Sequence, residues 1–304
     1  MKKNLLEKYE EWMEFCGMKY NAVVWIALSI VIGLVVGFVS LILGGIILKE
    51  PTLIPVAFGM AIMVLLLGLP YMKKESIVAN IEKNFSDALK QMADTLKAGD
   101  TYESALREVA NSDYGRLSEE MALSLRRLEE GENIEMALRV FSDRIDSRLI
   151  KRTIVIIIDS IKSGSSLAEI LEEIADDVRD LHKLKQERIA NTTMQFLFMV
   201  AAGGIIAPMI FGEVNAVMGV FAKVTIQAIS VNEAAVAMQT TNFIFMLIQG
   251  YIIIAVVGSG LMMSVIRQGK FNKSIIYIPI LLLVAFLVYY GTKIVIGTML
   301  AGSL

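Results

Sequence analysis

The sequence predicts an all-α, polytopic membrane protein with about five transmembrane helices and a six-helix bundle set between them. Three observations favour this class. Hydrophobic residues make up 55% of the 304 residues, and several uncharged runs are far longer than a strand. Most of the charged residues lie in one polar insert, residues 73–193. Within that insert, one amphipathic pattern with helical spacing occurs three times, so the insert is expected to be helical as well.

The first 20 residues predict an amphipathic lead, because Leu5, Tyr9 and Trp12 recur at the spacing of one helical face. A secretory signal is excluded, since glutamates stand where such a signal needs basic residues. Two interpretations stay open for residues 1–20. The helix either lies in the membrane interface with Trp12 at headgroup level, or packs on its own protein.

Five stretches, uncharged except for Lys293 near the end of the fifth, are long enough to cross about 30 Å of hydrocarbon. They are residues 21–48, 52–71, 193–212, 241–266 and 275–296. The first two form a transmembrane hairpin over residues 21–72, and the other three belong to a C-terminal membrane region, residues 194–304. Gly203, Gly204 and Pro208 predict a kink inside the third span. Residues 213–240 are too polar for a comfortable span and too apolar for a free loop.

A glycine turn is the repeated feature of the insert. Gly99, Gly131 and Gly164 lie 32 and 33 residues apart, and each ends an amphipathic run. A glycine is favoured there because it adopts the left-handed conformation that closes a helix. Two residues later stand Thr101, Asn133 and Ser166, which suit the N-cap of a following helix. Each copy is therefore helix, turn, helix, and three copies predict six helices.

One segment of the insert has an ambiguous pattern. Residues 153–158 are rich in β-branched side chains and could form a buried strand. The register of the repeat favours a helix instead, and we expect that helix to be fully buried.

Several kinds of chemistry are excluded. The chain has one cysteine and one histidine, which rules out an internal disulfide, a thiolate zinc cage and a His-rich metal centre. A phosphate-binding P-loop is absent. The insert is acidic, so nucleic-acid binding is not expected. The spans contain no ionisable residue at mid-depth, where ion-coupled carriers usually keep one. We therefore expect no catalytic, cofactor or metal residues, and no enzyme activity.

Two compact basic groups stand out on this acidic insert: Arg126 and Arg127, and then Arg148, Lys151 and Arg152. Both are explained either as solvated helix faces or as docking sites for an acidic partner. Basic residues also decide the orientation, because they accumulate at the membrane ends of the N-terminus, the insert and the turn at 267–273. This places the N-terminus and residues 73–193 in the cytoplasm and the C-terminus outside the cell membrane.

A family resemblance rests on a motif that occurs twice. Lys97-Ala98-Gly99-Asp100-Thr101-Tyr102 is followed by the similar Lys162-Ser163-Gly164-Ser165-Ser166-Leu167, in a helical insert bounded by spans. This arrangement resembles the F-domain of platform proteins from type II secretion and type IV pilus machines, including archaellum and tight-adherence versions. The single domain matches the half-length form.

The resemblance implies an inner-membrane platform without catalytic residues. In that family the cytoplasmic domain docks on a hexameric secretion ATPase, and the membrane part contacts pilin-like subunits. A chain with one F-domain is expected to pair with itself or with a second platform subunit. The alternative function is a membrane transporter or channel with a helical regulatory insert, and a membrane-bound enzyme is a third possibility.

Overall fold

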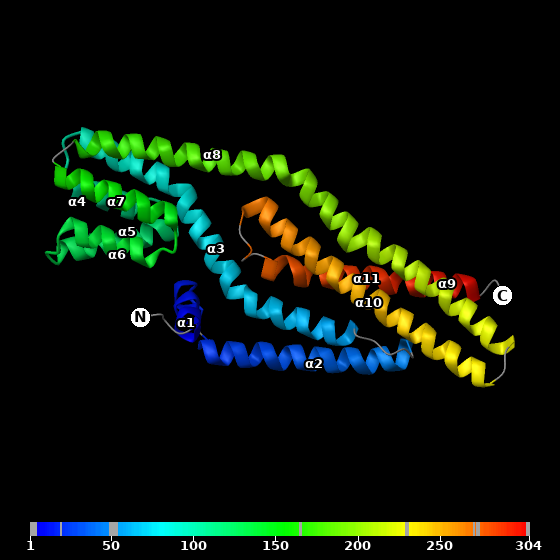
Figure 1. Ribbon diagram of the computed structural model, residues 1–304. Coiled ribbons are helices and arrows are strands. Elements are labelled where there is room, and N and C mark those ends of the chain that lie inside the picture. The colour runs from blue at the N-terminus through cyan, green and yellow to red at the C-terminus, as the bar shows by residue number, and fades with distance from the viewer. Residues whose placement is uncertain are drawn as a thin grey trace. The chain divides into compact units, whose positions relative to one another are not determined.

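The computed structural model describes residues 5–18, 20–48, 54–163, 166–228, 231–269, 271 and 274–301, and every long regular element in these ranges is a helix (Figure 1). The helices are α1 (Leu5–Phe15), α2 (Ala22–Leu48), α3 (Ile54–Lys97), α4 (Tyr102–Asn111), α5 (Arg116–Glu129), α6 (Ile134–Arg144), α7 (Arg148–Ser163), α8 (Leu167–Met199), the π-helix η1 (Val200–Ile206), α9 (Ala207–Ala228), α10 (Val231–Gln268) and α11 (Ser274–Ala301). The predicted all-α class is confirmed.

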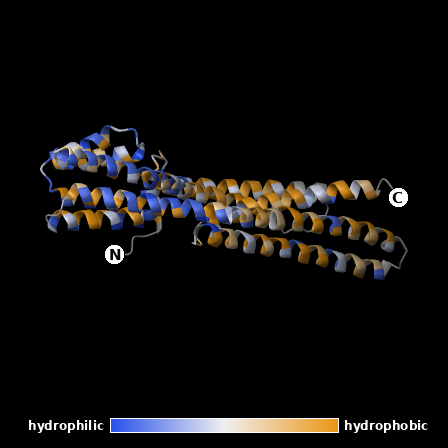
Figure 2. Ribbon diagram, turned by 90° about the horizontal axis from the view of Figure 1, so that it is seen from above, coloured by the Kyte–Doolittle hydropathy of each residue, from blue (hydrophilic) through white to orange (hydrophobic). Residues whose placement is uncertain are grey.

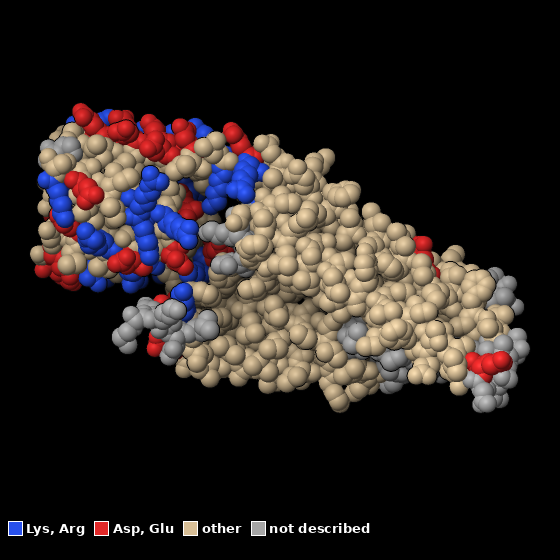
Figure 3. Space-filling model, in the orientation of Figure 1, with Lys and Arg blue, Asp and Glu red and all other residues tan. Residues whose placement is uncertain are grey.

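The chain forms two compact units. The membrane unit comprises Met1–Pro70 and Ile189–Leu304, and the polar unit comprises Tyr71–Arg188. Hydropathy separates them clearly, since the helices of the membrane unit are mostly hydrophobic and those of the polar unit are amphipathic (Figure 2). Charged side chains crowd the polar unit on the face drawn in Figure 3 and are sparse on the rest of that face. Two helices, α3 and α8, each contribute residues to both units.

Five segments are long and apolar enough to cross a membrane, which agrees with the five predicted spans. They are Ala22–Ile42, Val56–Lys97, Leu167–Ala222, Glu233–Arg267 and Ser274–Leu300. The protein is therefore a multi-pass membrane protein. The third segment contains η1, which includes Gly203 and Gly204, the glycines for which a kink is predicted. A Cβ atom on Gly203 would lie 2.5 Å from the Ser259 hydroxyl oxygen, so glycine permits a close approach of α10 here.

The lead helix α1 packs on its own protein, the second of the two interpretations. The side chains of Met13 and Cys16 are buried. The Tyr9 hydroxyl donates a hydrogen bond of 2.9 Å to the backbone carbonyl of Leu67 in α3. The apolar face of α1 is thus covered by the membrane unit.

Helices α2 and α3 form the predicted hairpin, and two features explain their close packing. A Cβ atom on Gly59 would lie 2.8 Å from the Gly33 carbonyl oxygen, so small residues let the backbones meet. Pro70 lies inside α3 and has no N–H, which deprives the Leu66 carbonyl of its usual helical donor. The indole Nε1 of Trp25 donates to that carbonyl at 3.2 Å.

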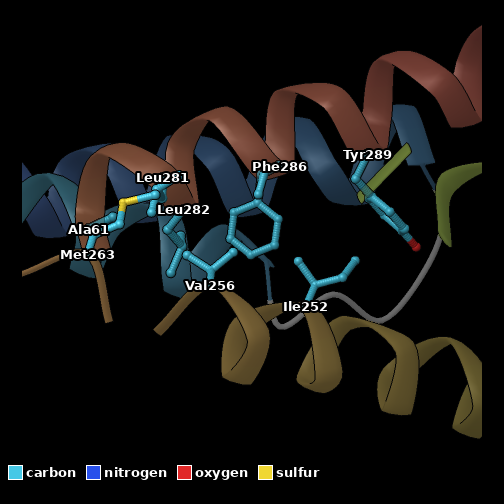
Figure 4. Packing of buried hydrophobic residues seen from close by; sticks show 9 residues of the cluster. Ala61, Ile252, Val256, Met263, Leu281, Leu282, Phe286 and Tyr289 are labelled. Atoms are coloured by element: carbon cyan, nitrogen blue, oxygen red, sulfur yellow. The ribbon is translucent and has the colours of Figure 1, made fainter. Parts of the chain in front are cut away.

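The C-terminal helices share a buried apolar core. In it, Phe286 of α11 points toward Val256 and Ile252 of α10 (Figure 4). Residues 213–228 continue α9 as a helix, and α10 begins at Val231, so most of the ambiguous region 213–240 is helical, with residues 229–230 outside the described residues. One polar residue of this region has a structural role, because the fully buried Asn215 amide donates to the hydroxyl of buried Tyr289 on α11.

The polar unit contains the expected six helical segments: the end of α3, α4 to α7, and the start of α8. Its core is formed by buried apolar side chains, among which the rings of Phe85 and Phe141 stack with centroids 6.2 Å apart. The burial of one carboxylate was not predicted from the sequence. The fully buried Glu120 side chain accepts hydrogen bonds from Arg144 of α6 at 2.7 Å and forms an ion pair with Arg116 at 3.2 Å.

The ambiguous segment 153–158 is helical and lies within α7. The expectation that it is fully buried is wrong, since Val155 is 51% exposed and Ile156 is 42% exposed. Thr153, Ile154, Ile157 and Ile158 are buried on the opposite face. The helix therefore lies at the surface of the polar unit and presents a second apolar stripe outward.

Replacing Phe85 with alanine is expected to destabilise the polar unit by about 3–5 kcal/mol, because the change leaves a cavity in a packed core. The expected readout is faster hydrogen exchange of α4–α6 amides in the full chain in detergent. Tyr102→Ala is a matched control, since this aromatic side chain is 46% exposed. Equal exchange in the two variants would contradict the assigned core.

Replacing Gly212 with alanine is expected to destabilise the membrane unit by about 1–3 kcal/mol through overpacking. The new Cβ atom would lie 2.7 Å from the Tyr289 carbonyl oxygen. Gly219 on the same helix has no such neighbour within 4 Å, so Gly219→Ala should leave stability unchanged or raise it. Thermal denaturation in detergent measures both, and a tolerated Gly212→Ala would refute the packing of α9 on α11.

Candidate docking surface

The repeated glycines form backbone turns in the polar unit. Gly99 and Gly131 have φ angles of 92° and 91°. Each is followed by a helix whose first N–H groups are capped: Thr101 accepts from the Ser104 N–H at 3.2 Å, and Asn133 accepts from the Glu135 N–H at 3.1 Å. Gly164, the third predicted turn, lies outside the described residues. These turns connect consecutive helices, and the candidate docking surface is formed by other residues.

The five basic residues fall into two separate groups. Arg126 and Arg127 lie in the last turn of α5, and Arg127 forms an ion pair with Glu132 at 3.3 Å. The other three begin α7. The Glu120–Arg144 pair brings the first half of α5 beside the last turn of α6, and α7 starts shortly after. The two groups therefore lie toward opposite ends of the α5–α6 hairpin.

The helix dipole explains one group and not the other. Arginines in the last turn of α5 complement the partial negative charge at a helix C-terminus. Arg148, Lys151 and Arg152 lie in the first turns of α7, and the first turn of this helix contains no acidic residue. Cations at a helix N-terminus face a partial positive charge, so this group weakens its own helix. Its role is better sought in contacts with another molecule.

The α7 group borders a groove between α7 and α8 of about 530 Å³. Its lining residues are Arg148, Leu149, Arg152, Thr153 and Ile156 from α7, and Ile174, Asp177, Val178, Asp180, Leu181 and Leu184 from α8. The floor is apolar and partly open, since Ile156, Leu181 and Leu184 are 42%, 52% and 61% exposed. Arg148, Arg152 and Ile156 follow one another at intervals of one helical turn, which forms a continuous stripe.

The two edges of the groove carry opposite charges. The α7 edge presents Arg148 and Arg152, which make no ion pair with another described residue. The α8 edge presents Asp177 and Asp180, of which Asp180 contacts Lys183 at 3.0 Å. An apolar floor between charged edges is typical of a protein–protein interface. The sequence pointed to the cations but not to the apolar floor beside them.

A second hollow, of about 600 Å³, lies between α3, α4 and the loop that follows α4, and is polar. Gln91 donates to Glu108 at 3.1 Å, and the Thr95 hydroxyl donates to the other oxygen of the same carboxylate. These donors lower the pKa of Glu108 below its usual value. Tyr114 donates to Gln91 at 2.9 Å and completes the network. The arrangement ties α3 to α4 and to the loop that follows α4.

Helices α3 and α8 are also joined by ion pairs inside the polar unit. Lys185 contacts Glu82 at 3.1 Å, and Arg179 contacts Asp87 at 2.9 Å. Lys97 pairs with Glu172. The residue numbers rise along α3 as they fall along α8, so the two helices run antiparallel. The helices that enter and leave the polar unit are thus paired along its length.

Comparison with known proteins agrees with this architecture. Residues 88–212 match the family model described as type II secretion system protein F. The chain is 23% identical over 292 residues to flagella accessory protein J of Methanococcus voltae, an alignment that covers 92% of the chain. It spans about half, 52%, of the length of that curated relative. No solved structure matches the chain.

The matched residues begin in the last part of α3, include α4 to α8, and end in the first turns of α9. They therefore contain both basic groups, the groove and the Lys97–Glu172 pair between α3 and α8, while Glu82 and Asp87 precede them. Residues 88–212 are therefore similar to the type II secretion system protein F family, and the rest of the chain lies outside this match.

Proposed function

We propose that the protein is an inner-membrane platform of a type IV pilus-like or type II secretion machine. In this role it couples a cytoplasmic secretion ATPase to the insertion of pilin-like subunits into a filament. The observation that carries the proposal is the connection of the F-domain to the spans. Helices α3 and α8 have residues in both units, so force on the polar unit reaches the membrane helices through helical backbone.

The proposed orientation follows the distribution of basic residues. The N-terminus and the polar unit lie in the cytoplasm of this proposed machine, and the C-terminus lies outside. This places the groove and both basic groups on the side where ATP is available. The protein itself supplies no nucleotide-binding loop, so the energy source is a separate subunit.

The five basic residues remain proposed docking residues, assigned to two partners. Arg126 and Arg127, together with Lys151 toward the other end of the α5–α6 hairpin, contact an acidic surface of the hexameric ATPase. Arg148 and Arg152 line the groove and meet a different partner. In the membrane, the exposed apolar faces of the spans contact pilin-like subunits, and a homo-oligomer or a second platform subunit completes the platform. Neither a cofactor nor nucleic acid takes part.

Deleting residues 75–192 from the chain is expected to abolish co-purification of the cognate secretion ATPase, because the F-domain is the proposed receiver. Arg126→Glu with Arg127→Glu should weaken the complex about tenfold, or roughly 1.4 kcal/mol. The weakening should shrink at high salt, since exposed charges are screened. Affinity is measured over a salt series with both full-length variants in detergent.

The matched control is Lys83→Glu with Arg139→Glu, which reverses the same amount of charge at exposed positions of the polar unit. This control should bind the ATPase normally. Binding retained after deletion of residues 75–192 would refute the proposed coupling role. Equal weakening in both charge variants would refute Arg126 and Arg127 as the docking residues.

Cysteine labelling tests the proposed orientation. Glu233→Cys is expected to react with a membrane-impermeant maleimide added to intact cells. Residue 233 lies between the third and fourth predicted spans, and the proposed orientation puts this connection outside. Arg139→Cys should react only after lysis. Native Cys16 is buried and gives little background. Labelling of Arg139→Cys in intact cells would contradict the proposed topology.

A further inference from the structure

We propose that the α7–α8 groove is the interface between two copies of this chain, related by a twofold axis parallel to the two helices. This goes beyond the proposed function, which leaves the pairing surface unassigned, and it does not depend on the ATPase. The interface residues are Arg148, Arg152 and Ile156 of α7, and Asp177, Leu181 and Leu184 of α8.

The apolar floor gives the first argument. Ile156, Leu181 and Leu184 of the floor are between 42% and 61% exposed, although they belong to the polar unit. Charged residues crowd the face of the polar unit drawn in Figure 3, so a lipid covering is not expected for this unit. Contiguous exposed apolar side chains bordered by charges mark a protein interaction site. Covering this floor therefore calls for a protein surface of the same kind.

The charges at the edges give the second argument. A rotation about an axis parallel to α7 and α8 keeps every residue at its own height along the helices. It places α7 of one copy beside α8 of the other, in a four-helix arrangement. Arg148 and Arg152 line the same groove as Asp177 and Asp180, so they share one level along the helices. The rotation therefore sets the cationic edge of each copy against the acidic edge of its partner.

A partner with one sign of charge fits the groove less well. An acidic helix would be attracted to Arg148 and Arg152 but repelled by Asp177 and Asp180, and a basic helix would meet the reverse. A second copy carries both signs in the required order. The groove is therefore specific for the chain itself, while the α5 group stays free for another partner.

Charge exchange between two differently tagged copies of the full chain tests the proposal. Arg152→Asp alone and Asp177→Arg alone should each lose dimers, since each homodimer then faces like charges across the groove. Co-expression of the two variants should restore dimers, because both contacts between unlike copies are again opposite in sign. The fraction of tagged copies that co-purify in detergent is the readout, with an expected difference of at least fivefold. Mixed variants that pair no better than either alone would overturn the interface.

Cysteine cross-linking in native membranes provides a second readout that does not require altered charges. Leu181→Cys lies near the proposed axis and should form a disulfide between copies on mild oxidation. Met136→Cys, which is 54% exposed on α6, is the control and should remain monomeric. Equal cross-linking at both positions, or a Leu181→Cys adduct with a different protein, would overturn the proposal. Loss of ATPase binding leaves both results unaffected, so the two hypotheses fail separately.

Discussion

The structure of the polar unit depends on the antiparallel pairing of α3 and α8. Both helices also belong to the membrane unit, so the chain enters and leaves the polar unit through this pair. Exposed ion pairs contribute only about 0–1 kcal/mol each, so the three between α3 and α8 cannot hold the pair alone. Burial of Phe85, Leu89, Leu171 and Ile174 supplies the main stabilisation. The ion pairs are better understood as setting which turn of α3 faces which turn of α8, and the short helices α4 to α7 fold between them.

Local chemistry made much of this fold predictable from sequence. Helix spacing, glycine turns and capping residues act within a few positions, so Gly99, Thr101, Gly131 and Asn133 pointed to helix ends without knowledge of the fold. Contacts between distant residues were not predictable in this way. Glu120 looks like an ordinary surface glutamate until Arg116 and Arg144 enclose it. Ile156 looked fully buried because its neighbours are apolar, yet only the arrangement of α7 against α8 decides which stripe faces outward.

The same distinction between local features and contacts of distant residues applies to the candidate docking surface. The sequence drew attention to the arginines of α7, because a compact basic group stands out on an acidic insert. It could not reveal that Leu181 and Leu184, about 30 residues away, complete an apolar floor beside them. Nor could it separate the two basic groups, since their separation depends on how α5 pairs with α6. Similarity to the type II secretion system protein F model marks the domain, while the opposite charges of the two groove edges are a property of this chain's own side chains.

The bond between Trp25 and the carbonyl left free by Pro70 has a consequence for sequence change. In hydrocarbon, an unsatisfied backbone carbonyl costs several kcal/mol, because no water can replace the missing donor. Pro70 is therefore tolerable in α3 only while an indole or similar donor reaches Leu66 from α2. If Pro70 is replaced by a residue with an N–H, the Leu66 carbonyl regains a helical donor and no longer needs Trp25. If Trp25 is lost first, the Leu66 carbonyl has no donor while the proline is still present. Substitution at these two positions is thus ordered: the proline must be lost before, or together with, the tryptophan.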